Sequence, residues 1–220
     1  MTADDKLVEY YRKRAGEYEE IYDWKDPDRQ REQDLVSTAI RDSLRGRDVL
    51  EVACGTGWWT RILSESARSI MATDLGDEVM AIAREKKYGC PVTFKREDAY
   101  NLSFEDDSFN GGLAFSWFSH IPHDLIDIFI DEFHRVLTEG SRVFIADNTY
   151  IQGIGGEPVG KEGDPNTYKI RALKDGGVFT IVKNYFSVED LVDIFGRHVE
   201  GFSENDVIQG ECFWYVDYVL

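Results

Sequence analysis

The sequence predicts an α/β fold built on a doubly wound, mostly parallel sheet, and three observations support this prediction. Between residues 47 and 147, runs with strand character alternate with helical runs, the pattern that right-handed crossovers produce. A glycine turn at residues 54–57 directly follows the first apolar strand. The clearest helix has its apolar residues on one face at helical spacing. These residues are Ile126, Phe129, Ile130, Phe133 and Leu137.

The elements expected along the chain follow from the same patterns. Residues 4–45 form two helical stretches separated by a break at Pro27. Asp77 suits the N-cap of one later helix, Gly89 lies just past its end, and Gly140 ends the next one. We expect strands at 47–53, 68–74, 91–98, 109–118 and 141–147, and helices at 59–67, 77–89 and 126–137.

The pattern changes after Asp147. A glycine-rich polar stretch is followed by a predicted β-hairpin, 167–173 with 178–186. A helix at 187–195 begins with a capping-box pattern, and the tail holds two strands that turn near Gly210. We therefore expect one domain over residues 1–220. Its helical N-terminal cap covers 1–45, and an insertion on the substrate side covers 148–186.

The composition excludes several classes of function. The net charge of −17 disfavours binding to a nucleic-acid backbone. Cys54, Cys90 and Cys212 form no CxxC pair, so we expect neither a disulfide framework nor a metal site. We see no secretory signal and no membrane span, so the expected protein is cytoplasmic, with no membrane partner.

The glycine turn lies where a parallel sheet binds its ligand, beyond the carboxyl end of a strand. A dinucleotide site would place a third glycine three residues after the second. Counted from Gly55, that position is Thr60, and counted from Ala53 it is Trp58. The sequence therefore disfavours an NAD(P)-dependent oxidoreductase.

The run Glu51-Val52-Ala53-Cys54-Gly55-Thr56-Gly57 resembles the first motif of the class I S-adenosylmethionine (SAM)-dependent methyltransferases. In that family an acidic residue stands two positions before a G-x-G-x-G turn. Ala53 replaces the first glycine, a modest change unless the backbone needs a positive φ there. The resemblance covers roughly residues 5–147, and Asn110 stands where the family usually has Asp.

The resemblance implies a seven-stranded sheet with a C-terminal antiparallel strand, and SAM as the cofactor, with S-adenosylhomocysteine (SAH) as its product. It implies that Glu51 organises the cofactor's amino group, that Asp74 binds the ribose and that Asp98 takes the adenine amino group. Leu75 would lie against the adenine. The implied cofactor-binding residues are Tyr11, Glu51, Ala53, Cys54, Gly55, Gly57, Asp74, Leu75, Asp98, Ala99 and Phe115. Trp58 is a further candidate for the cofactor or acceptor pocket, and the alternative is that Trp58 and Trp59 pack in the core under the helix that opens at Gly57.

Methyl transfer requires mainly alignment of the reactants, with a base where the acceptor is protonated. His120 is the candidate base, and the alternatives are a solvated loop histidine or a residue that packs behind the site. The insertion presents aromatic and cationic residues that suit a small acceptor, partly anionic or aromatic. The alternative is a hairpin that extends the sheet or makes a dimer contact. The candidate substrate-binding residues are Tyr150, Tyr168, Arg171 and Lys183.

The sequence thus predicts a methyltransferase that acts on a small-molecule acceptor, as a monomer or a homodimer. A non-catalytic SAM-binding regulator is the second hypothesis, and the oxidoreductase is the third. The identity of the acceptor and the atom that is methylated stay open at this point.

Overall fold

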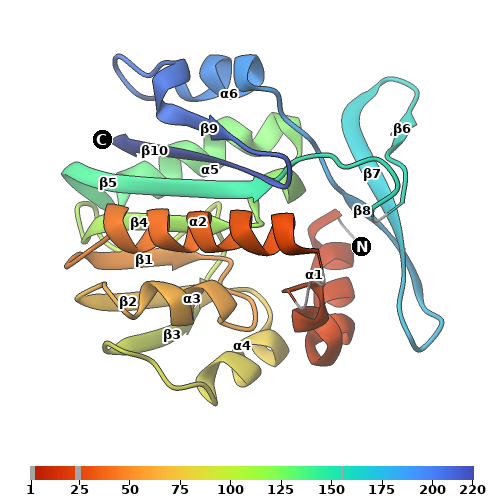
Figure 1. The fold of residues 1–220 in the computed structure, drawn as a ribbon, viewed down its shortest axis with the longest axis horizontal. Helices are drawn as coiled ribbons and strands as arrows, with labels where there is room; N and C mark the ends of the chain where they lie inside the picture. Colours follow the sequence, from red (N-terminus) through yellow and green to blue (C-terminus); the bar gives the residue numbers. More distant parts are fainter. Residues whose placement is uncertain (1–2, 23–25, 155) are drawn as a thin grey trace.

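The structure is a computed structural model that describes residues 3–22, 26–154 and 156–220. A seven-stranded sheet in the order β3-β2-β1-β4-β5-β10-β9 forms its centre (Figure 1). All neighbours among β1–β5 are parallel, whereas β10 is antiparallel to both β5 and β9. The strands are β1 (Asp48–Val52), β2 (Ser69–Asp74), β3 (Val92–Arg96), β4 (Phe109–Phe115), β5 (Leu137–Asn148), β9 (Val207–Gln209) and β10 (Phe213–Val219).

Helices cover both faces of this sheet. Alternate residues of β1 point to opposite faces, so Val49 packs in one core and Leu50 in the other. Both side chains are fully buried. The helices on the Val49 face are α2 (Pro27–Ser43), α3 (Trp58–Leu63) and α4 (Asp77–Arg84), and those on the Leu50 face are α5 (Ile126–Arg135) and α6 (Val188–Phe195). No helix in the described ranges has the length and apolarity needed to cross a membrane.

Two further units lie at the carboxyl ends of the strands (Figure 1). One is α1 (Ala3–Arg14) with the 3-10 helix η1 (Ala15–Tyr22). The other is a three-stranded antiparallel sheet that contains the expected hairpin and one additional strand. Leu7 and Tyr10 of α1 pack against Leu173 and Ile181 of this sheet. Its strands are β6 (Val159–Lys161), β7 (Asp164–Ala172) and β8 (Val178–Val182).

Three expected helix ends are wrong. The helix expected at 59–67 is α3, which ends at Leu63. Helix α4 ends at Arg84, and the Tyr88 hydroxyl donates to the carbonyl of Ala83 at 2.6 Å where the chain turns away. Gly140 lies inside β5, where its φ is +78° and its amide donates to the carbonyl of Leu220 at 2.7 Å. Pairing with neighbouring strands therefore draws residues 137–140 into the sheet, and Leu137 belongs to a strand.

The C-terminal predictions are confirmed. Ser187 and Asp190 form the reciprocal hydrogen bonds of a capping box at the start of α6. The tail forms β9 and β10, and the amide of Gly210, between them, donates to the carbonyl of Phe213 at 2.8 Å.

Candidate active site

The glycine turn after β1 has an unusual backbone. Ala53, Gly55 and Gly57 all adopt positive φ, at 56°, 55° and 77°. A Cβ on Gly57 would come within 2.6 Å of the Tyr88 hydroxyl and 2.9 Å of the Ala83 Cβ. Gly57 is therefore required both for its backbone conformation and for the close approach of α3 to α4.

Asp74, at the end of β2, connects this turn to the next loop. Its carboxylate accepts a hydrogen bond from the Gly55 amide at 2.9 Å and another from the Gly76 amide at 2.8 Å. Burial raises the pKa of Asp74, and the backbone amides of Gly76, Gly55 and Leu75 oppose this rise. Each oxygen keeps capacity for a second donor, which is what a ribose diol would use.

Glu51 lies at the base of the site, in β1. Only 2% of the residue is exposed, and its Oε2 has no hydrogen-bond partner in the described part of the chain. Burial raises the pKa of Glu51 to about 8, with the nearby Asp74 contributing. An unsatisfied buried carboxyl of this kind fits a cationic group of a ligand.

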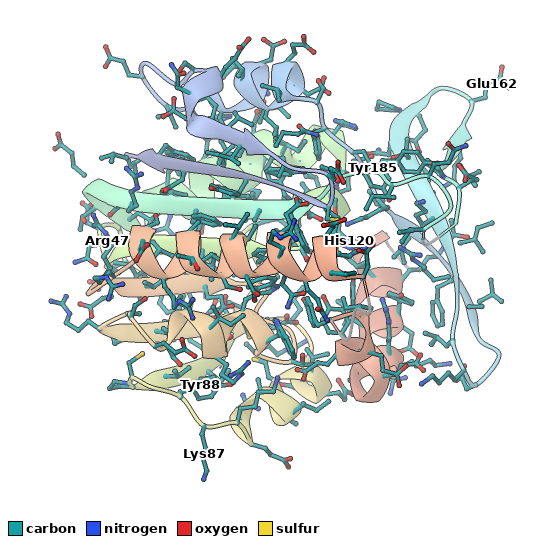
Figure 2. The ribbon with its side chains drawn as sticks, viewed as in Figure 1. Arg47, Lys87, Tyr88, His120, Glu162 and Tyr185 are labelled. Carbon is teal, nitrogen blue, oxygen red and sulfur yellow. The ribbon has the colours of Figure 1, made fainter. Side chains whose placement is uncertain are left out.

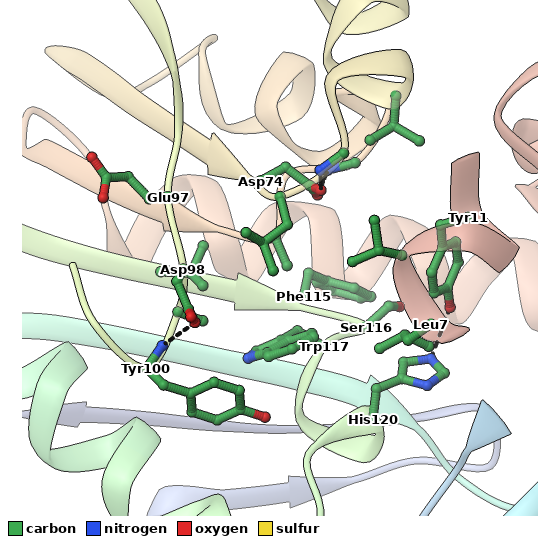
Figure 3. Close-up of a pocket in the computed structure, with 18 of the residues that line it drawn as sticks. Leu7, Tyr11, Asp74, Glu97, Asp98, Tyr100, Phe115, Ser116, Trp117 and His120 are labelled. Carbon is green, nitrogen blue, oxygen red and sulfur yellow. Dashed lines mark hydrogen bonds between the residues drawn. The ribbon is translucent and has the colours of Figure 1, made fainter. Parts of the chain in front are cut away.

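A pocket opens at the carboxyl edge where the strand order reverses between β1 and β4. We call it the donor pocket. Asp74, Asp98, Phe115, Trp117 and Tyr11 surround it in Figure 3. The residues predicted from sequence that line it are Tyr11, Ala53, Gly55, Asp74, Leu75, Asp98, Ala99 and Phe115. The described lining does not include Glu51, Cys54, Gly57 or Trp58.

The two tryptophans after the turn pack against the N-terminal cap. Trp59 stacks on Phe115, with ring centroids 3.7 Å apart, and its Nε1 donates to the Tyr22 hydroxyl at 3.1 Å. Trp58 stacks on the Tyr22 ring at 4.5 Å. These contacts fasten η1 to α3, so the tryptophans hold the cap over the glycine turn.

His120 lies in the loop after β4 and is 5% exposed (Figures 2 and 3). Its Nδ1 donates to the carbonyl of Val182 at 2.7 Å, because a carbonyl only accepts. Its Nε2 therefore accepts from the Tyr11 hydroxyl at 2.8 Å. Burial and the positive charge of Lys183 lower the pKa of His120 well below its usual value, so the ring is neutral.

A second pocket adjoins the donor pocket, and we call it the acceptor pocket. Among the described residues, four line both pockets: Tyr11, Tyr18, Ser116 and His120. Ser116 has a φ of +57°, a strained conformation for a non-glycine residue, as is common at functional sites.

Of the predicted substrate-binding residues, Arg171 and Lys183 line the acceptor pocket. Tyr150 and Tyr168 are not in its described lining. Instead, the hydroxyl of Tyr150 donates to Glu157, and that of Tyr168 donates to Asp164 at 2.5 Å. Tyr185, at the base of the small sheet in Figure 2, lines the pocket in their place.

Sequence reasoning missed several pocket residues. Leu7 and Val8 reach the donor pocket from α1, and Trp117 reaches it from the loop after β4. The sequence "FSWF" around Trp117 carries the only local signal, an aromatic run where a strand ends. Leu7 and Val8 resemble ordinary residues of an amphipathic helix, so nothing local distinguishes them.

Comparisons with known proteins agree with this geometry. A family model described as a methyltransferase domain matches residues 49–140. The solved complex of DhpI with SAH is 26% identical, with a TM-score of 0.76, and the likeness covers 97% of this chain and 94% of DhpI. These likenesses support a class I SAM-dependent methyltransferase. DhpI has also been solved with SAM and HEP, at 25% identity and a TM-score of 0.73 over 97% of this chain and 95% of DhpI.

Curated relatives match a shorter stretch. A demethylmenaquinone methyltransferase of Staphylococcus aureus is 31% identical over 103 residues, which is 45% of this chain and 42% of the relative. A fatty-acid O-methyltransferase of Mycolicibacterium smegmatis is 31% identical over 113 residues, or 50% of this chain and 40% of the relative. The match thus spans less than half of these relatives.

Proposed function

We propose that this chain transfers a methyl group from SAM to a small molecule held in the acceptor pocket. The observation that carries this proposal is that the donor and acceptor pockets meet at Tyr11, Tyr18, Ser116 and His120. A donor and an acceptor bound on either side of these residues would lie next to each other. Such alignment is the main requirement of an in-line methyl transfer.

The residues of the donor pocket fit SAM, which supplies an activated methyl group on a sulfonium. Asp74 has acceptor capacity for the ribose hydroxyls. Glu51, which is buried and outside the described lining, has a carboxyl oxygen without a hydrogen-bond partner that suits the ammonium group. Leu75 and Ala99 provide apolar surface for the adenine, with Asp98 beside them. Leu7 and Tyr11 of α1 and Tyr18 of η1 line the pocket on its N-terminal side.

The predicted role of His120 as a base depends on the acceptor. A hydroxyl acceptor must lose a proton, and His120 is the imidazole at the junction of the pockets. The Nε2 atom of His120 is occupied by the Tyr11 hydroxyl. To accept the proton, Nε2 would have to lose this hydrogen bond and form one to the hydroxyl of the acceptor. His120→Ala with unchanged turnover on the true acceptor would exclude the role.

Calorimetry with SAH, followed by a methyl-transfer screen with labelled SAM, tests the proposal. We expect Asp74→Ala to weaken SAH binding roughly ten- to hundredfold, since each hydrogen bond to a charged group is worth about 1.5–3 kcal/mol. Asp77→Ala is the matched control, because that carboxylate is exposed in the first turn of α4. Binding of NAD(P) in place of SAH would contradict the proposal.

The first acceptors to screen come from the comparisons: HEP, a demethylmenaquinone and a fatty acid. Transfer to any of them supports the enzyme. If SAH binds but neither these compounds nor other small molecules are methylated, the results favour the second hypothesis, a non-catalytic SAM-binding regulator.

A further inference from the structure

The donor pocket is lined by carboxylates and by few side-chain N–H groups. Three carboxylates belong to its described lining: Asp74, Glu97 and Asp98. Among the described residues of this lining, only Trp117 and His120 carry a side-chain N–H. The Nδ1–H of His120 is used by the carbonyl of Val182. The indole N–H of Trp117 is therefore the side-chain N–H that the described lining leaves for a ligand.

This indole N–H lacks an acceptor inside the protein. The Nε1 atom of Trp117 is buried and has no hydrogen-bond partner in the described part of the chain. Trp59, by contrast, donates its Nε1–H to the Tyr22 hydroxyl at 3.1 Å. A buried N–H without an acceptor is unfavourable, because folding removes the water that bonds to it in the unfolded chain. Such a group at the wall of a binding pocket fits an acceptor atom that the ligand supplies.

The surroundings of Trp117 hold its ring in place. Its carbonyl accepts from the His120 amide at 2.8 Å, in the turn that follows β4. Its ring packs against the rings of Tyr100 and Phe129, with centroids 6.0 and 6.4 Å apart. Figure 3 shows the indole nitrogen on the side of Asp98 and Tyr100. The N–H is thus preorganised next to the loop that carries Asp98.

We propose that Trp117 selects the adenine base of the methyl donor, by donating its indole N–H to a ring nitrogen of that base. This inference rests on the proposed function, which places the adenine beside Leu75, Asp98 and Ala99. Ring nitrogens of adenine only accept hydrogen bonds, and so do ionised carboxylates, so the acids of the pocket cannot satisfy these nitrogens. The N–H of Trp117 supplies the missing donor.

The test measures binding of SAH and three of its analogues to the full chain by calorimetry. In each analogue, C–H replaces one adenine ring nitrogen: N1, N3 or N7. The pH is chosen so that all four bases are neutral. We expect at least one analogue to bind roughly tenfold more weakly than SAH, because it leaves the Trp117 N–H without an acceptor. That analogue identifies the nitrogen that Trp117 contacts.

Trp117→Phe separates this hydrogen bond from other contacts to the same nitrogen. The variant keeps an aromatic ring and removes the N–H, so it should bind SAH and the weaker analogue with nearly equal affinity. Trp214→Phe is the matched control. Trp214 also has a buried Nε1 without a described partner, but it lies in the core, outside the described lining of the donor pocket. This control should keep the tenfold difference.

If Trp117→Phe does not fold, NMR of the isotope-labelled wild-type chain decides. The indole N–H signal of Trp117 should move downfield when SAH binds, and less when the weaker analogue binds. An unchanged signal overturns the inference. So does equal binding of SAH and all three analogues, or a difference that persists in Trp117→Phe, which would assign the nitrogen to another donor such as a backbone amide. Failure of SAH to bind would instead reject the proposed function.

Discussion

Ala53 has a φ of +56° in the glycine turn, a conformation that costs a residue with a side chain about 1 kcal/mol. We expect Ala53→Gly to remove this strain. The greater freedom of glycine in the unfolded chain offsets part of the gain, so the net stabilisation should be about 0.5 kcal/mol. Urea unfolding measures it.

Ala72→Gly is the control for this substitution. Ala72 lies in the middle of β2 and is fully buried, and its strand backbone has no such strain. Its replacement should destabilise the protein by about 1 kcal/mol. If Ala53→Gly and Ala72→Gly change the unfolding free energy by the same amount, the backbone at Ala53 is not strained.

Glu51 links cofactor binding to pH. Its pKa of about 8 means that the carboxyl is mostly protonated at neutral pH when the pocket holds no ligand. If the ammonium group of SAH binds there, it favours the ionised form. Binding should then release a proton, and affinity should rise with pH up to about 8.

Calorimetry in two buffers of different ionisation enthalpy measures this release. Glu51→Gln keeps the shape of the side chain and cannot titrate, so it should bind SAH more weakly and without proton release. Release that persists in this variant would assign the proton to another group.

At the scale of elements, Gly57 controls the packing of α3 against α4. Gly57→Ala adds a Cβ at a φ of +77° that meets the Tyr88 hydroxyl and Ala83. Backbone strain and overpacking together should destabilise the protein by about 2–4 kcal/mol. SAH affinity should fall as well, because the same turn lines the donor pocket.

Gly55→Ala separates the two causes. Gly55 also has positive φ, but a Cβ there meets nothing within 4 Å. This variant should cost only the backbone strain, about 1 kcal/mol of unfolding free energy. Thermal or urea unfolding measures both variants. If Gly55→Ala and Gly57→Ala lose the same unfolding free energy, the close approach of α4 does not contribute to the effect of Gly57→Ala.

The small sheet acts as another element, because it supplies Arg171, Lys183 and Tyr185 to the acceptor pocket. Exchange of residues 148–186 for the matching segment of a relative should change acceptor preference while SAH affinity stays the same. A competition assay with paired acceptors measures this, and an unchanged preference would show that the segment does not select the acceptor.

For the whole molecule, buried histidines make stability depend on pH. Burial lowers the pKa of His134 to about 4, and its Nε2 bonds to the Tyr218 hydroxyl at 2.7 Å. The unfolded chain protonates this histidine near pH 6.5, whereas the folded chain resists protonation. Stability should therefore fall as the pH drops from about 6.5 towards 4, by about 1 kcal/mol after allowance for partial exposure.

Thermal unfolding at a series of pH values measures this loss. His134→Gln can keep a hydrogen bond to Tyr218 and does not titrate, so its melting temperature should change less over the same range. An equal slope in both proteins would assign the effect to other groups, such as the buried His120.

The sequence by itself determined the sheet, the glycine turn and part of the donor pocket. These features depend on local patterns: strand and helix periodicity, a turn that needs glycine, and acids at the ends of strands. Because parallel strands end at one edge, Asp74 and Asp98 could be placed there without the structure. Trp58 was a candidate for the pocket with packing as the alternative, and its ring stacks on Tyr22 outside the described lining.

Only the tertiary structure decided which residues line the acceptor pocket. Arg14, His120 and Arg171 lie in a helix, a loop and a strand far apart in the chain, and no local pattern brings them together. Likewise, the amide of Gly140 donates to the carbonyl of Leu220, which follows β10, so the end of α5 depends on a distant part of the chain. The tertiary contacts also set the charge of His120, because burial beside Lys183 keeps its ring neutral.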